Sequence, residues 1–178
     1  MTVLAEFDGW MNDLARVVSP NQDERPDGSV VCLLVVHAIS LPPGEFGGSG
    51  TIDLFMNQLD PEAHPYYREI SHLKVSAHFL IRRDGTAIQF VSGLRRAWHA
   101  GASVWNGRDR CNDFSIGIEL EGCDDRPFEP VQYAMLNELI ERLRGAYPIE
   151  AIVGHSDIAP DRKTDPGPCF DWSLVRPL

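Results

Sequence analysis

The stretch VVCLLVVH, residues 30–37, is a continuous apolar run that ends in a histidine. It is rich in β-branched residues and too short for a typical helix, which favours a strand buried on both faces of a sheet. We therefore expect residues 30–36 to form a central strand that ends at His37. The segments that follow it predict the rest of the sheet.

Further strands are expected on the C-terminal side of this run. VSAHFLIR and TAIQFV, within residues 75–91, flank the strong turn signal Asp84-Gly85 and predict a hairpin. FSIGIELEG, residues 114–122, predicts another strand. A last strand is expected near residues 149–153, immediately before a loop rich in proline.

The clearest helix is expected at residues 130–144, where apolar side chains recur every four positions from Val131 to Leu143. Pro130 suits the first helical turn, and Gly145 suits the C-terminal cap. This helix can cover one face of the predicted sheet.

Weaker patterns complete the expected organisation. They predict short helices at 8–18 and 51–58, polar loops at 19–29 and 60–72, and a long irregular segment at 94–112. Strands and helices alternate unevenly, which predicts a mixed α/β fold with a central mixed sheet. The length of 178 residues is that of one domain, so we expect a single domain over residues 1–178.

The composition excludes several classes of function. A net charge of −10 argues against nucleic acid or an anionic membrane surface as the main partner. Residues 1–18 lack the pattern of a signal peptide, and no apolar run reaches the roughly 18 residues of a membrane span. The four cysteines include no C-x-x-C pair, so we expect reduced thiols and a cytoplasmic protein.

The segment GHSDIAPDRKTDPGPCFDW, residues 154–172, follows the last predicted strand and is stiffened by prolines. Hydrolytic zinc sites commonly take three protein ligands and leave one position for water. His155 and Asp165 could supply a close pair of ligands, with His37 as the distant third. The remaining histidines stay rivals at this point: His64, His72, His78 and His99.

Two carboxylates and a lysine are candidates for the chemistry. Glu119 can point from its strand into a partly buried cavity, where desolvation would suit it to a general base. Glu121 shares that strand face but lies nearer the turn, so we expect it to be solvated. The pair also permits a glycosidase. Lys163 is either a surface lysine or a group that faces a developing oxyanion.

The aromatic residues of the irregular segment have two interpretations. Trp98, His99 and Trp105 could line a groove for a sugar or peptide, or they could belong to the core. A cysteine nucleophile is disfavoured, since Cys32 lies within a predicted strand and no cysteine has an obvious activating base. The glycine-containing segments 38–50 and 94–112 are candidates to gate the site.

Several motifs together resemble the AmpD-type amidases, a group within the zinc-dependent N-acetylmuramoyl-L-alanine amidases that is related to phage lysozyme-like amidases and peptidoglycan recognition proteins. In chain order these motifs are VVHAISLPPGEFGG, HPYY, VSAHFLIRRDG, RAWHAG, CNDFSIGIELEG and GHSDIAPDRKTDPGPCFDW. The resemblance extends from about Trp10 to Trp172. Each motif is short, but their common order and spacing make the resemblance specific.

The resemblance implies a central mixed sheet flanked by helices, as in peptidoglycan recognition proteins, and a Zn2+ cofactor held by His37, His155 and Asp165. It implies that Glu119 and Lys163 are catalytic. The substrate-binding residues that it implies are Tyr66, Lys74, Trp98, His99 and Arg110. Two positions depart from the family pattern. Ala38 stands where asparagine is frequent, and Lys74 stands where arginine is usual, which loses bidentate contact with a carboxylate.

The activity implied is hydrolysis of the amide between the lactyl group of 1,6-anhydro-N-acetylmuramic acid and L-alanine, in cytoplasmic peptidoglycan recycling. The partner implied is an anhydro-muropeptide substrate, with no obligate protein partner. In this mechanism Glu119 takes a proton from water, while zinc and Lys163 stabilise the oxyanion. Two alternatives remain: a sensor that binds peptidoglycan fragments without turnover, and the glycosidase, which would be indifferent to chelators.

Overall fold

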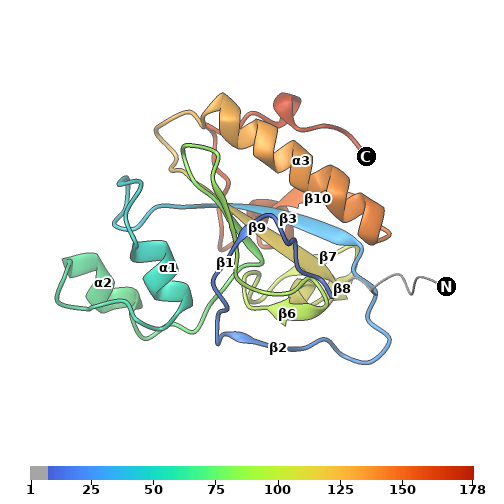
Figure 1. The fold of residues 1–178 in the computed structure, drawn as a ribbon, viewed down its shortest axis with the longest axis horizontal. Coiled ribbons are helices and arrows are strands. Elements are labelled where there is room, and N and C mark those ends of the chain that lie inside the picture. The colour runs from blue at the N-terminus through green and yellow to red at the C-terminus, as the bar shows by residue number, and fades with distance from the viewer. Residues whose placement is uncertain (1–7) are drawn as a thin grey trace.

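The computed structural model describes residues 8–178, which form a mixed α/β fold around one central sheet (Figure 1). The strands of this sheet lie in the order β1-β5-β4-β9-β3-β10. Their bounds are Ala15–Arg16 for β1, Leu33–Ile39 for β3, Phe79–Ile81 for β4, Ala87–Gln89 for β5, Ser115–Glu121 for β9 and Ala151–Gly154 for β10. β4 and β5 pair antiparallel, and the other neighbours in this sheet pair parallel. The expected mixed sheet is therefore confirmed.

The two long strands β3 and β9 form the middle of the sheet and are buried along most of their length. Side chains alternate between the two faces of a strand. On β3, Leu34 and Val36 pack toward helix α3 (Pro130–Ala146), whereas Leu33 and Val35 belong to a separate cluster of buried side chains. His37 therefore points to the face away from α3.

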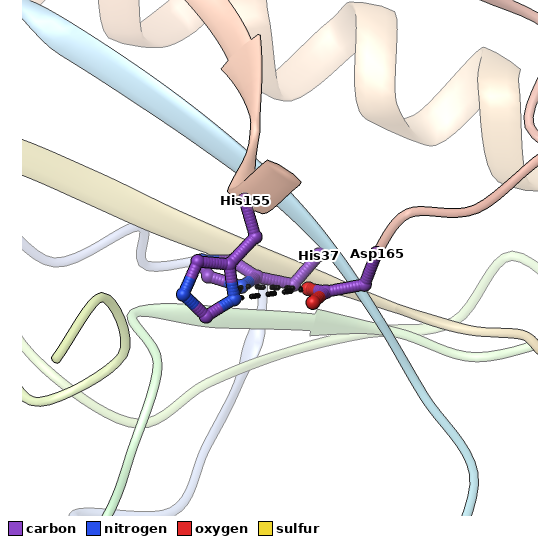
Figure 2. Close-up of side chains that lie close together, drawn as sticks. All are labelled: His37, His155 and Asp165. Atoms are coloured by element: carbon purple, nitrogen blue, oxygen red, sulfur yellow. Dashed lines mark hydrogen bonds and ion pairs between the residues drawn. The ribbon is translucent and has the colours of Figure 1, made fainter. Parts of the chain in front are cut away.

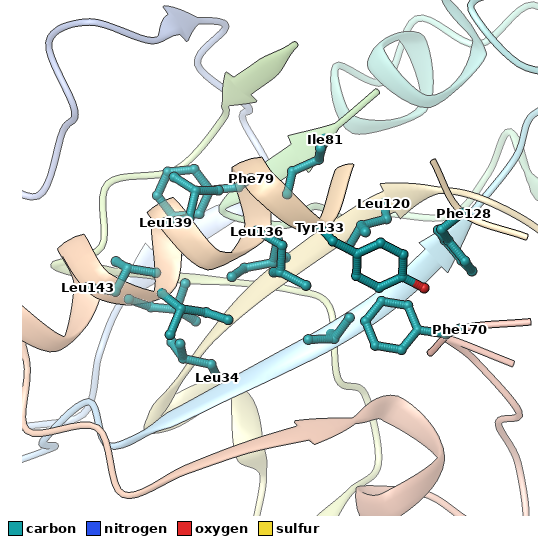
Figure 3. Close-up of a cluster of buried hydrophobic side chains, with 14 of the residues drawn as sticks. Leu34, Phe79, Ile81, Leu120, Phe128, Tyr133, Leu136, Leu139, Leu143 and Phe170 are labelled. Carbon is teal, nitrogen blue, oxygen red and sulfur yellow. The ribbon is translucent and has the colours of Figure 1, made fainter. Parts of the chain in front are cut away.

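The core under α3 is a continuous apolar layer between the helix and the sheet (Figure 3). Leu136, Leu139 and Leu143 of the helix join Leu34 and Phe79 of the strands in this layer. Leu136, Leu139, Ile140 and Leu143 are buried, whereas Val131, the first residue of the expected four-residue series, is exposed. This layer holds the strands in register and leaves their opposite face for the site.

The remaining elements lie around the sheet and are short. Their bounds are Gln22–Glu24 for β2, Arg95–Ala97 for β6, Val104–Trp105 for β7, Arg108–Asp109 for β8, Gly50–Phe55 for α1, Pro65–Ile70 for α2, His155–Ile158 for α4, and Cys111–Asp113 and Trp172–Leu174 for two 3-10 helices. β2 pairs with β6, and β7 with β8. None of the helices among residues 8–178 has the length and apolar character needed to cross a membrane.

The helix expected at residues 8–18 is wrong. Only Ala15–Arg16 of this segment form a regular element, the strand β1, which pairs with β5 of the hairpin. The Gln89 side chain accepts from the Met11 N–H and donates to the Gly9 carbonyl, and the Gln89 carbonyl accepts from the Val17 N–H. Pairing with the hairpin thus replaces the helical hydrogen bonds that the apolar spacing suggested.

Other boundaries also differ from expectation. The 60–72 segment, expected to be a loop, contains α2. The side chain of the N-cap residue His64 accepts from the Tyr66 N–H, and Pro65 is the first residue of the helix, where proline is favourable. β3 continues past His37 to Ile39, because β9 pairs with it as far as Glu121. The polar segment 19–29 includes β2, and 94–112 includes three short strands, β6, β7 and β8.

Candidate active site

Three side chains of types that can bind a metal ion meet at the carboxyl ends of β3 and β10 (Figure 2). His37 lies on β3, and His155 follows β10 as the first residue of α4. The two Nδ1 atoms lie 3.0 Å apart, and each lies 3.1 Å from Asp165 Oδ2. Because β3 and β10 are parallel neighbours, their carboxyl ends bring the histidines together. We refer to His37, His155 and Asp165 as the metal triad.

Asp165 reaches the triad from the proline-rich segment after α4. Its carbonyl accepts a hydrogen bond from the Ser156 N–H, which closes the loop between them at 2.9 Å. The Gly154 N–H, just before the histidine, donates to the Asp157 side chain at 2.7 Å. These local bonds hold His155 and Asp165 on the same side of the loop.

The outer nitrogen of His155 settles its tautomer. Nε2 lies 3.2 Å from the Ala100 carbonyl oxygen, which can only accept a hydrogen bond. When the ring carries one proton, that proton is therefore on Nε2, and Nδ1 presents a lone pair to the triad. Two imidazoles and one carboxylate are the donor set of hydrolytic zinc sites, so these residues fit a zinc ion.

Charge in the triad also suits a cation. Burial lowers the pKa of His37 to about 4, although the close contact with Asp165 acts in the opposite direction. Burial acts to raise the pKa of Asp165, but the close contacts with His155 and His37 outweigh it and hold this pKa below its usual range. At neutral pH the triad thus combines a neutral His37 ring with a carboxylate.

Glu119 lies beside the triad as the register partner of His37 on β9. Its side chain is buried, and its Oε2 has no hydrogen-bond partner among the described residues. Burial raises the pKa of Glu119 well above its usual value, the negative charge of Asp165 adds to this, and Lys163 opposes it. A buried carboxyl with a free oxygen is suited to proton transfer.

A cleft of about 480 Å³ opens over these groups. It brings together the triad, Glu119, Lys163 and three of the expected substrate-binding residues: Tyr66, Trp98 and His99. Its wall on one side is formed by residues 38–41, 43 and 44. We refer to the part that follows β3, residues 40–49, as the rim loop.

Two expected substrate-binding cations do not line this cleft. Lys74 is exposed between two lining residues, Leu73 and Val75. Arg110 is 72% exposed, pairs with Asp113 at 2.8 Å and lines a neighbouring groove. Their roles as carboxylate-binding residues stay predictions.

Glu121 is buried, and the expectation that it is solvated is wrong. Its carboxylate accepts from the N–H groups of Gly47 in the rim loop and Arg83 in the hairpin, both at 3.1 Å. The Arg82 guanidinium donates to the Gly47 and Gly48 carbonyls, and Arg83 stacks on Phe46 at 4.7 Å. Glu121 therefore anchors the rim loop.

Two rival histidines have structural contacts elsewhere. His78 Nδ1 accepts from the Gly117 N–H at 3.1 Å, and its Nε2 lies 3.1 Å from the Arg95 carbonyl. His64 caps α2. Among the described residues, these histidines do not join a cluster of metal-binding groups.

Sequence patterns did not single out Ala100, Asn112 or Ser115, whose contacts near the triad join distant parts of the chain.

This chain belongs to the N-acetylmuramoyl-L-alanine amidase family, whose model matches residues 27–168. The protein is therefore an amidase, as the motifs indicated. The cleft, the triad and Glu119 lie within the matched range.

The chain is similar over most of its length to AmpD amidases. The 1,6-anhydro-N-acetylmuramyl-L-alanine amidase AmpD of Enterobacter cloacae is 58% identical over 167 residues, which cover 93% of this chain and 89% of the relative. A crystal structure of a selenomethionine derivative of AmpD matches with a TM-score of 0.92 at 54% identity, covering 95% of this chain and 98% of that one. The resemblance to AmpD-type amidases is thus confirmed.

A more distant structure includes a substrate. The amidase AmiD of Escherichia coli, in complex with anhydro-N-acetylmuramic acid-L-Ala-D-gamma-Glu-L-Lys, matches with a TM-score of 0.59 at 30% identity. The match covers 84% of this chain and 58% of AmiD.

Proposed function

We propose that this protein is a zinc-dependent amidase that cleaves anhydro-muropeptides. The bond cleaved joins the lactyl group of 1,6-anhydro-N-acetylmuramic acid to L-alanine of the stem peptide. The observation that carries the proposal is the convergence of three metal-binding side chains beside the buried, partnerless oxygen of Glu119. The names of the AmpD relatives and the ligand of AmiD support the choice of substrate.

In this proposal His37, His155 and Asp165 hold Zn2+. A bound zinc ion supplies Lewis acidity, which polarises a carbonyl and makes water a stronger nucleophile at neutral pH. The outer contact of His155 with Ala100 keeps the His155 ring oriented toward the ion.

Glu119 acts as the general base and then as the general acid. Its free Oε2 accepts a proton from the attacking water and later delivers it to the departing amine of L-alanine. The raised pKa of Glu119 favours this second step, because the carboxyl retains the proton long enough to transfer it. Lys163, which also lines the cleft, places positive charge near the developing oxyanion.

The cleft residues bind the substrate. Tyr66, Trp98 and His99 face the muramyl sugar and the start of the stem peptide, and Lys74 and Arg110 bind the carboxylate of its third residue. A single amidase domain over residues 1–178 performs the reaction in the cytoplasm, within peptidoglycan recycling. The partners proposed are limited to this substrate, without nucleic acid, membrane or an obligate protein.

The test is a mass spectrum of products formed from anhydro-muramyl tripeptide by the purified protein, with zinc and with a chelator. We expect free tripeptide and anhydro-muramic acid only in the presence of zinc. Intact ligand in both samples would contradict the amidase and favour a sensor that binds without turnover. Cleavage that persists after complete metal removal would contradict zinc dependence.

A further inference from the structure

Both histidines of the metal triad direct their outer ring nitrogen to one dipeptide, His99–Ala100. His37 Nε2 lies 2.9 Å from His99 Nδ1, and His155 Nε2 lies 3.2 Å from the Ala100 carbonyl. Metal-binding histidines depend on such outer contacts for ring orientation and tautomer. Two adjacent residues thus support ligands that are themselves far apart in sequence.

This dipeptide is fixed in place by the side chain of Asn112. Its amide oxygen accepts from the backbone N–H of His99 at 3.1 Å and from that of Ala100 at 2.8 Å. Arg162 donates to the Ala100 carbonyl at 2.7 Å. The position of one amide oxygen therefore sets the outer contacts of both histidines.

The ring of His99 is held on its remaining sides. Its Nε2 lies 3.1 Å from Ser115 Oγ, so both ring nitrogens have protein partners. The ring also lies against β9, since a Cβ atom on Gly117 would come within 2.4 Å of it. These contacts leave the ring little freedom to rotate toward a ligand in the cleft.

Two arrangements of protons satisfy the row His37–His99–Ser115. In one, His37 Nε2 donates to His99 Nδ1, and His99 Nε2 donates to Ser115. In the other, Ser115 donates to His99 Nε2 and His99 Nδ1 donates to His37 Nε2. The proton of His37 then occupies Nδ1. Only the first arrangement leaves a lone pair on His37 Nδ1, which a metal ligand requires.

We propose that His99 and Asn112 are positioning residues of the metal centre. His99 accepts the Nε2 proton of His37 and so keeps Nδ1 free for the metal, while Asn112 places His99 and the Ala100 carbonyl against the two histidines. This inference rests on the zinc site of the proposed function. It assigns His99 a role in the zinc site beside the contact with substrate that the proposed function gives it.

The first test compares zinc dissociation constants, measured by competition with a chelating dye. His99→Phe removes the ring nitrogens, and Asn112→Ala removes the shared oxygen without changing either ring. We expect each to raise the dissociation constant by about 10–100-fold. Asn112→Asp keeps an oxygen that can accept both N–H groups and should stay close to wild type. The exposed His72→Phe is the matched histidine control and should not change zinc affinity.

The second test observes the proton itself in zinc-loaded protein labelled with 15N-histidine. In wild type the His37 Nε2 proton should exchange slowly with solvent, and in His99→Phe it should exchange fast, whatever the effect on stability. Zinc affinities of His99→Phe and Asn112→Ala within twofold of wild type, or an unchanged His37 signal, would overturn the inference. Wild-type protein that binds no zinc would overturn the proposed function and this inference together.

Discussion

His37 and Glu119 occupy paired positions on the parallel strands β3 and β9, so the proposed metal ligand and the proposed base project from the same face of the sheet. A slip of one residue in this register would turn one of them toward the apolar layer under α3. The position of His37 relative to Glu119 is therefore set by the pairing of two buried strands.

Replacement of Glu119 should separate chemistry from metal binding. Glu119→Gln removes the proton acceptor but no metal-binding atom, so we expect turnover to fall by about 10²–10⁴-fold while zinc content stays at the wild-type level. The measurement is product formation together with zinc analysis after dialysis. Turnover equal to wild type would show that another group is the base.

The same variant should not be less stable than wild type at neutral pH in the absence of zinc. A carboxyl with a raised pKa in the folded state loses protons more readily when unfolded, so its contribution to stability falls as pH rises above about 4.5. Glu119→Gln removes the ionisable group, so the variant does not lose stability in this way as pH rises. Urea unfolding at pH 5 and pH 7 should show the difference between variant and wild type growing with pH.

Removal of Asp165 should weaken metal binding directly. Asp165→Ala leaves two imidazoles as ligands. Loss of a residue that only supports a ligand costs about 10–100-fold in metal affinity, so we expect the loss of a ligand itself to lower zinc affinity by more than about 100-fold. Zinc-loaded wild type should also resist unfolding more than the metal-free protein, by about 4 kcal/mol when free zinc is about 1,000 times its dissociation constant. Unchanged zinc retention in Asp165→Ala would remove this residue from the ligand set.

Acid should destabilise the metal-free protein through its buried histidines. Burial lowers the pKa of His37 to about 4 and that of His78 to about 3. The unfolded chain then binds more protons than the folded one below about pH 6.5, so the free energy of unfolding falls as pH decreases from 6.5 toward 4. Each such histidine contributes up to about 1.4 kcal/mol per pH unit.

Urea midpoints measured between pH 7 and pH 5 with a chelator present test this expectation. His78→Gln should give a shallower dependence on pH, because one buried titrating ring is gone. The exposed His72→Gln should keep the wild-type dependence. A dependence that is the same in all three proteins would contradict the role of His78.

Loss of the rim-loop anchor should affect substrate binding more than the metal. Glu121→Ala removes the acceptor of the exposed Gly47 N–H and of the partly buried Arg83 N–H. A fully buried unsatisfied group costs about 1–3 kcal/mol, so we expect a loss at or below the low end of this range. We expect lower stability and a higher KM, with zinc affinity unchanged. Complete loss of turnover with normal substrate binding would instead favour the glycosidase, which needs both carboxylates.

Many features of the fold follow from local sequence patterns. The buried strand before His37, the hairpin around Asp84-Gly85 and the helix after Pro130 each depend on neighbouring residues, and the structure contains all three. The expected convergence of His37, His155 and Asp165 used a general property of sheets, that strand ends can meet. The positions of side chains at strand ends can therefore be predicted from the sequence.

The features that were missed depend on contacts between distant residues. Residues 8–18 have helical spacing, yet Gln89 pairs with their backbone from 78 positions away in its bond to Met11. The acceptor role of Glu121 requires Gly47, 74 positions away. Similarly, nothing in the neighbourhood of Asn112 indicates that its amide oxygen orients two histidines.

The anchoring of the rim loop also bears on how quickly substrate can enter. Glu121 and Arg82 hold the loop by its backbone, and Phe46 is stacked on Arg83, so an outward swing would break several contacts at once. These contacts argue against the gate considered for residues 38–50, which stays a prediction. A cleft with a fixed wall admits its ligand by diffusion alone, so the association rate should fall in proportion to solvent viscosity and show no slower opening phase.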